Sequence, residues 1–186
     1  MTDDVYTLPA DLPVPQDDGA ADHLLGTMMP QLTLESTQGP VSMRALSQEL
    51  LVLYVYPRTG RPGVPSPEGW DAIPGARGCT PQSLGFRDAA ERFQGLGALV
   101  AGLSAQSLED QLEFAERNEI PYPLIADPEL KLAAALQLPT FEVEGQTLYK
   151  RLALVVQACA IAKVFYPVFP PDENAREVLA WLEARR

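Results

Sequence analysis

One cysteine lies at a position where a thiol becomes reactive. Cys79 occurs where a Gly-rich loop turns into a helix, and Thr80 and Pro81 suit an N-cap and a first helical residue. The free N–H groups and the positive dipole end of a helix start favour a thiolate, the form of cysteine that attacks. The alternative is a small, inert cysteine buried in the core. Gly75 and Gly78 favour the reactive interpretation, because glycines let backbone segments approach closely.

Few other side chains offer chemistry of this kind. The second cysteine, Cys159, is eighty positions from Cys79, so the chain has no C-x-x-C pair of the thioredoxin type. His23 is the single histidine, which nearly excludes a zinc site built on histidines, and we expect no metal and no cofactor. A Cys–His dyad would have to use His23, which lies in a polar N-terminal segment and is expected to be a solvated bystander.

The composition limits the class of protein. A chain of 186 residues, 46% of them hydrophobic, is long enough for one domain with a sizeable core. The formal net charge of −11 disfavours nucleic acid and anionic membranes as partners. The start of the chain is acidic where a signal peptide would be basic, and the apolar stretch 152–169 is interrupted by polar residues and a proline. We therefore expect a cytoplasmic protein that does not span a membrane.

The pattern along the chain predicts one α/β domain at 23–186, preceded by an extended, Pro-rich arm at 1–22 that is ordered only if it docks. A long Pro/Gly-rich insertion at 58–77 precedes Cys79, and Trp70 is expected to anchor it. Strands are expected at 31–35, 41–43, 51–56, 98–103, 124–127, 141–149 (a hairpin), 151–156 and 161–166. Helices are expected at 81–93, from a cap at Ser107 to the prolines at 121 and 123, at 128–136, and from a cap at Asp172 through Leu182. This alternation predicts a mixed central sheet with helices on both faces.

Several segments resemble a known family. The segments Tyr54-Val55-Tyr56-Pro57 and Gly78-Cys79-Thr80-Pro81, followed by Gly85-Phe86-Arg87-Asp88, are similar to motifs of peroxiredoxins of the Q, or bacterioferritin-comigratory, type. Segments 123–128 and 169–174 also match, so the resemblance covers residues 29–184. It implies a thioredoxin-like fold and a thiol-dependent peroxidase that reduces hydrogen peroxide or organic hydroperoxides.

The resemblance also implies roles for individual residues. Cys79 falls on the peroxidatic position, whose thiolate attacks the terminal peroxide oxygen and becomes a sulfenic acid. Arg151 falls where the family places its catalytic arginine, although a surface arginine at a strand start is the alternative; Lys150 competes for this role, and alternation points only one of the two inward. Pro57 corresponds to a proline that shields the cysteine, and the expected substrate pocket contains Pro57, Thr59, Thr80 and Tyr54.

Three departures from the family pattern affect this interpretation. Ala76 stands where the family has a peroxide-binding threonine, so Thr59 or Thr80 would have to substitute. Leu84 stands at the usual resolving-cysteine position, which favours a one-cysteine cycle with an external thiol reductant such as thioredoxin; the alternative is a distant resolving role for Cys159. A different alignment would place Val64 in the cysteine position and leave the protein inactive.

These departures motivate a second hypothesis, a non-catalytic thioredoxin-fold redox sensor or chaperone. A thiol oxidoreductase without peroxidase activity is a third possibility that the missing C-x-x-C pair disfavours. By resemblance, we expect a monomer rather than an oligomer.

Overall fold

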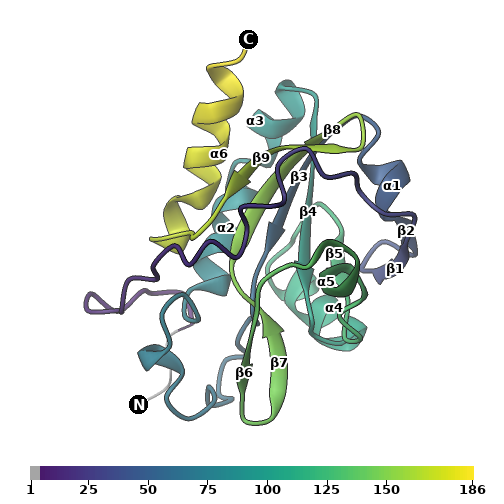
Figure 1. The fold of residues 1–186 in the computed structure, drawn as a ribbon. Coiled ribbons are helices and arrows are strands. Elements are labelled where there is room, and N and C mark those ends of the chain that lie inside the picture. The colour runs from purple at the N-terminus through teal and green to yellow at the C-terminus, as the bar shows by residue number, and fades with distance from the viewer. Residues whose placement is uncertain (1–4) are drawn as a thin grey trace.

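The computed structural model describes residues 5–186, which fold around a seven-stranded mixed sheet (Figure 1). The strands follow the order β2-β1-β5-β4-β3-β8-β9, in which β3, β4 and β5 are parallel and the other neighbours antiparallel. Their bounds are β1 Thr33–Ser36, β2 Val41–Ser42, β3 Leu50–Val55, β4 Ala98–Ser104, β5 Leu124–Ala126, β8 Leu152–Gln157 and β9 Ala160–Phe165. A separate hairpin is formed by β6 Thr140–Val143 and β7 Gln146–Tyr149.

Helices cover both faces of this sheet, as the alternating pattern predicts. The α-helices are α1 Met43–Leu46, α2 Cys79–Asp88, α3 Ala90–Gly95, α4 Leu108–Arg117, α5 Lys131–Leu136 and α6 Asn174–Glu183, and the 3₁₀ helices are η1 Trp70–Ala72 and η2 Pro171–Glu173. One core contains buried side chains of α1 and α5, and the other contains those of α2, α3, α4 and α6. The predicted mixed sheet with two covered faces is confirmed.

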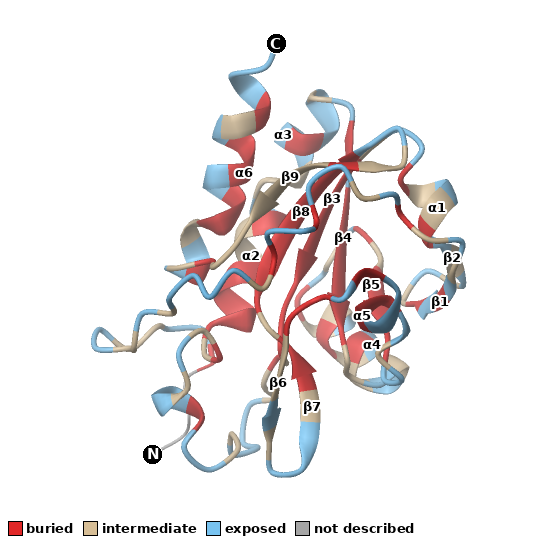
Figure 2. Cartoon of the chain, viewed as in Figure 1, coloured by how far each residue is buried: buried red, intermediate tan, exposed pale blue. Residues whose placement is uncertain are grey.

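Strand β3 lies between the two cores and contributes side chains to both, and the chain that follows it enters the site. Its side chains alternate, so that Leu53 belongs to one core and Tyr54 to the other. Figure 2 shows β3, β4 and β8 as buried strands, which matches the continuous apolar run in the sequence. Because β8 runs antiparallel to β3, the end of β3 and the start of β8 lie at the same edge of the sheet. The segments that carry Pro57 and Arg151 therefore meet at this edge.

The start of α2 corrects one expectation. The helix begins at Cys79 itself, so the prediction of Thr80 as N-cap and Pro81 as first helical residue was wrong. Gly78 is the N-cap, with a φ of 107° in the left-handed region that glycine adopts most readily. The predicted single helix at 81–93 is also divided, because α2 ends at Asp88 and α3 follows from Ala90. Cys79 is thus the first residue of the helix, whereas the sequence pattern placed it just before the N-cap.

Of three other helix starts, one agrees with the sequence pattern and two differ from it. Ser107 caps α4 as predicted, since its hydroxyl oxygen accepts the N–H of Asp110 at 3.1 Å. The expected cap at Asp172 was wrong, because this residue lies within η2 and α6 begins at Asn174. Helix α5 begins at Lys131 rather than at 128. The N–H of Lys131 donates to the Asp127 carboxylate at 2.9 Å.

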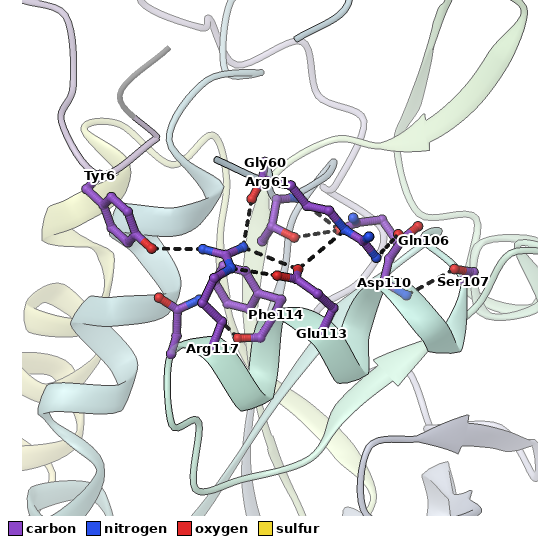
Figure 3. Close-up of polar contacts among 11 residues, drawn as sticks. Tyr6, Gly60, Arg61, Gln106, Ser107, Asp110, Glu113, Phe114 and Arg117 are labelled. Atoms are coloured by element: carbon purple, nitrogen blue, oxygen red, sulfur yellow. Dashed lines mark hydrogen bonds and ion pairs between the residues drawn. The ribbon is translucent and has the colours of Figure 1, made fainter. Parts of the chain in front are cut away.

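The 58–77 segment is folded against the hairpin and against α4. Trp70 is 5% exposed and packs with Leu148 and Phe141 of the hairpin, which confirms its predicted anchoring role. Figure 3 shows a polar network in which Arg117 of α4 donates to the carbonyl oxygen of Gly60 and to the hydroxyl of Tyr6. The division of the chain into an arm and one domain stays a prediction. Within residues 5–186, no helix is long and apolar enough to cross a membrane.

Candidate active site

Cys79 occupies the first turn of α2 and is almost fully enclosed. Its side chain is 3% exposed and belongs to the same buried cluster as Tyr54, Tyr56 and Phe86. The thiol donates to the carbonyl oxygen of Ala76 at 3.6 Å. At this position the sulfur lies at the positive end of a ten-residue helix, which favours a negative charge on it.

Arg151 lies directly against this sulfur. Its Nη2 atom is 3.2 Å from Cys79 Sγ, and the residue is 3% exposed between β7 and β8. Lys150 is directed elsewhere, because its Nζ atom lies 2.8 Å from Asp18 Oδ2. Only one of the two cationic side chains is therefore inward, as alternation predicts. A guanidinium at hydrogen-bond distance from the sulfur stabilises a thiolate.

Backbone carbonyls hold the Arg151 guanidinium in place. Nη2 donates to the carbonyl oxygens of Gly75, Ala76 and Arg77 at 3.2, 3.0 and 3.2 Å. The turn before Cys79 thus wraps around one end of the guanidinium. The Nε–H of Arg151 is buried and has no hydrogen-bond partner among residues 5–186, so one donor remains for another acceptor.

Gln82 is a site residue that the sequence interpretation missed. Its Oε1 accepts a hydrogen bond from Arg151 Nη1, and its Nε2 donates to Asn174 Oδ1 at 2.9 Å. Gln82 lies three residues after Cys79 on α2, so the two side chains share one side of the helix. The spacing of three residues from Cys79 is the one weak signal that the sequence offered, and the structure adds that the amide is fully buried.

Three of the residues expected in the substrate pocket, Thr59, Thr80 and Pro57, are all buried but lie in different elements and have different contacts. Thr59 is buried, and its hydroxyl donates to Gln106 Oε1 at 3.2 Å. Thr80 is buried in the first turn of α2. Pro57 is buried, and its carbonyl oxygen accepts from the hydroxyl of Ser104 at 3.1 Å. The described contacts thus direct the hydroxyl of Thr59 to Gln106 rather than to Cys79.

Tyr54 is a core residue rather than part of an open pocket. It is fully buried, its ring stacks on Phe86 at 4.4 Å, and its hydroxyl lies 3.0 Å from that of Tyr122. Burial is the main reason that the pKa of Tyr54 is raised well above its usual value, so the phenol stays neutral. Gly102 leaves room for this ring, since a Cβ atom there would lie 2.9 Å from Tyr54 Cζ. Tyr54 therefore supports α2 through packing.

Cys159 lies beyond the opposite end of β8 from Arg151. The strand between them has six residues and spans about 20 Å. A disulfide requires Cα atoms about 4.4–6.8 Å apart, so Cys159 reaches Cys79 only after local unfolding. Its thiol donates to the carbonyl oxygen of Arg44 at 3.4 Å. Val64, the residue of the alternative alignment, is 48% exposed on the 58–77 segment, whereas Arg151 contacts Cys79.

A cavity of about 260 Å³ opens beside Arg151. Most of its wall is apolar, and the polar residues on it are Gln16, Lys150, Arg151 and Tyr166. The apolar wall is formed by Pro15, Ile73, Pro74, Gly75, Phe141, Pro167 and Val168. Arg151, which contacts the buried sulfur, therefore also lies on the wall of a space large enough for a small organic molecule.

Comparison with known proteins gives consistent matches. The redoxin family model matches residues 24–179. The chain is 29% identical over 161 residues to chloroplastic peroxiredoxin Q of Sedum lineare, which is 86% of this chain and 77% of that protein. It is 31% identical over 115 residues to peroxiredoxin Bcp of Bacillus subtilis, which is 61% of this chain and 64% of that protein. The crystal structure of peroxidoxin BcpB from Mycobacterium tuberculosis superimposes with a TM-score of 0.69 and 26% identity, covering 87% of this chain and 97% of that one.

Proposed function

This chain belongs to the redoxin family as a thioredoxin-fold peroxiredoxin of the Q type, a thiol-dependent peroxidase, and on that premise we propose that Cys79 is its peroxidatic cysteine and Arg151 its activating residue. The observation that carries the proposal is the 3.2 Å contact between Arg151 Nη2 and Cys79 Sγ at the start of α2. A structural cysteine needs no buried cation at this distance. The same contact favours an enzyme over a non-catalytic sensor or chaperone.

The proposed step is a nucleophilic attack by sulfur on oxygen. The Cys79 thiolate attacks the terminal oxygen of a hydroperoxide, an S–O bond forms, and the O–O bond breaks. The second peroxide oxygen leaves as hydroxide or alkoxide and takes a proton from solvent to give water or an alcohol. Sulfur loses two electrons and becomes a sulfenic acid, while the peroxide gains them.

Arg151 has two tasks in this step. Its charge stabilises the thiolate before attack and the negative charge that develops on the leaving oxygen. Its unpartnered Nε–H is available to a peroxide oxygen, and the carbonyls of the 75–77 turn fix the guanidinium plane. Fixed donors of this kind cost no reorganisation when the reaction occurs.

The sulfenic acid returns to a thiol through an external reductant in this proposal. Two reductant thiols supply two electrons, form a disulfide and release water, and a dithiol of the thioredoxin type would serve. Leu84 on α2 and the distance of Cys159 support a one-cysteine cycle. A cytoplasmic location is part of the same proposal, because a cycle that uses free thiols suits a reducing compartment. The proposal also takes the protein to be a monomer.

Peroxide consumption with a dithiol reductant tests the assignment. Cys79→Ser is expected to abolish turnover, because the serine hydroxyl is not ionised at neutral pH. The matched variant Cys159→Ser is expected to keep turnover within about twofold of the unmodified protein, since Cys159 lies outside the site. Retained turnover in Cys79→Ser overturns the mechanism. Loss of turnover in Cys159→Ser alone would overturn the one-cysteine cycle.

A further inference from the structure

The N-terminal arm lies over the turn that carries Cys79, although it precedes the residues matched by the redoxin family. A Cβ atom on Gly78 would lie 2.9 Å from Leu8 Cδ2, and one on Gly75 would lie 3.5 Å from Pro15 Cβ. The arm therefore packs against the same turn whose carbonyls hold Arg151. Figure 1 shows it crossing from the region of the 58–77 segment toward β9.

Polar contacts hold the arm at both ends. The Tyr6 hydroxyl accepts a hydrogen bond from Arg117 Nη1 at 2.8 Å, within the network of Figure 3. At the other end, Asp18 accepts from Lys150 Nζ and from the Tyr166 hydroxyl, each at 2.8 Å. Lys150 and Tyr166 also line the cavity beside Arg151. The second group of contacts therefore fixes the arm at the cavity itself.

The arm completes that cavity. Pro15 and Gln16 form one wall, and the rest is formed by residues of the 58–77 segment, of β6, of the link between β7 and β8, and of the segment after β9. The volume of about 260 Å³ far exceeds the roughly 15 Å³ that one water molecule requires. Hydrogen peroxide, with two heavy atoms, would leave most of this space unfilled. An apolar wall of this size instead suits an organic group.

We propose that the arm is a specificity-determining element, in which Pro15 completes an apolar site for the organic part of a hydroperoxide held at Arg151. The inference rests on the proposed function, which already includes organic hydroperoxides, and adds the part of this chain that selects among peroxides: the arm favours hydroperoxides with a bulky apolar group over hydrogen peroxide. The apolar group leaves water for the cavity, while the peroxide oxygens reach Arg151 and Cys79. A methylene contact in such a pocket changes specificity by about tenfold or more.

Two matched variants test the proposal by steady-state kinetics with cumene hydroperoxide and hydrogen peroxide. Pro15→Asp places a charge in the apolar wall, and Val14→Asp places the same charge next to it on a side chain that is 61% exposed. We expect Pro15→Asp to lower kcat/KM for cumene hydroperoxide about tenfold and that for hydrogen peroxide less than twofold. Val14→Asp is expected to leave both values unchanged.

The ratio of the two kcat/KM values decides the outcome, because a loss of folded protein lowers both by the same factor. An unchanged ratio in Pro15→Asp, or an unmodified protein that prefers hydrogen peroxide, overturns the inference while leaving the peroxidase assignment intact. Binding of cumyl alcohol, the reduction product, measured by calorimetry, gives a readout without turnover. We expect Pro15→Asp to raise its Kd about tenfold relative to Val14→Asp, and equal Kd values would contradict the proposal.

Discussion

At the scale of single residues, the donors around Cys79 determine how well the site stabilises the thiolate and positions a peroxide. One nitrogen of Arg151, Nη2, donates to the sulfur and to three carbonyl oxygens, while its Nε–H has no partner among residues 5–186. A lysine would keep the charge but not the fixed plane of donors. Charge alone therefore does not reproduce this site.

Arg151→Lys tests whether geometry as well as charge is required. We expect kcat/KM for hydroperoxide to fall by about 10²-fold, the usual effect of removing one positioned donor from a developing charge. Stopped-flow measurement of Cys79 oxidation gives the rate. Arg92→Lys is the control, because Arg92 lies on α3 with an exposed side chain that pairs with Glu183. A fall of less than threefold in Arg151→Lys would show that the planar guanidinium is unnecessary.

Gln82 is a positioning residue, because it acts on the sulfur only through Arg151. Gln82→Ala removes the acceptor of Arg151 Nη1, and we expect kcat/KM to fall about tenfold. The pH–rate profile of Cys79 alkylation is expected to move to higher pH, a change that simple loss of packing does not cause. Gln82→Glu keeps an acceptor for Arg151 but adds a negative charge beside it, so it should not restore the profile and should move it further to higher pH. An unchanged profile in Gln82→Ala would assign Gln82 to packing alone.

The residues differ in how far the sequence could predict them. Cys79 and Arg151 were assigned through the family motifs, and the structure brings them together. Gln82 was missed because a single amide on a helix has no periodic signal, and its partner Asn174 lies 92 positions away. The position of Pro15 on the cavity wall could not be predicted either, because it depends on where the arm docks.

At the scale of elements, the turn from Gly75 to Gly78 positions the whole site. It supplies the carbonyls that hold Arg151 and the residue from which α2 begins. Gly78 is enclosed as well as left-handed, because a Cβ atom there would overlap Pro171 and lie 2.9 Å from Leu8. The start of α2 is thus fitted between η2 and the arm.

Gly78→Ala is expected to destabilise the protein by about 1–3 kcal/mol, through strained backbone and the displaced neighbours. Gly95→Ala is the matched control, since Gly95 is helical and a Cβ atom there meets nothing within 4 Å. That variant is expected to be neutral or stabilised by up to about 1 kcal/mol. Urea denaturation measures both. Equal stability of the two variants would contradict the close approach at Gly78.

The sheet was predictable from the sequence to a greater degree than the helix starts were. Apolar runs such as that of β3 are buried on both faces, so their pattern is local and visible. The starts of α2 and α6 depend on a glycine dihedral angle and on η2, which arise from tertiary packing. The strands are therefore visible in the apolar pattern of several residues, whereas a helix cap depends on the tertiary neighbours of a single residue.

At the scale of the whole molecule, the arm joins parts of the chain that are distant in sequence. Its contacts run from Arg117 on α4 to Lys150 and Tyr166 beside the cavity. Hydrogen bonds from Lys150 and Tyr166 lower the pKa of Asp18 well below its usual range. Because the pKa of Asp18 is lower in the folded state, its charge stabilises the folded protein fully at pH values above the ordinary aspartate pKa of about 3.9. This stabilisation is lost as the pH falls from there through the lowered pKa. The charge on Asp18, and with it this residue's contribution to docking, therefore does not change as pH rises from about 5 to neutrality.

Asp18→Asn is expected to loosen the arm without unfolding the domain. Exposed charge pairs contribute about 1 kcal/mol or less, so the midpoint of thermal unfolding should change by only a few degrees. Hydrogen exchange in the arm, followed by mass spectrometry at neutral pH, is expected to become faster, and Asp11→Asn should leave it unchanged. Equal exchange in the two variants would show that Asp18 does not hold the arm.

The central claim is that Cys79 attacks the peroxide. Its most direct test is a single exposure of the reduced protein to one equivalent of hydroperoxide without reductant, followed by trapping of sulfenic acid and mass mapping. The account predicts one oxygen atom added at Cys79, at a rate that falls about 10²-fold in Arg151→Lys, with Cys159 unmodified. Oxidation at Cys159 instead, or a rate at Cys79 that does not depend on Arg151, would contradict it.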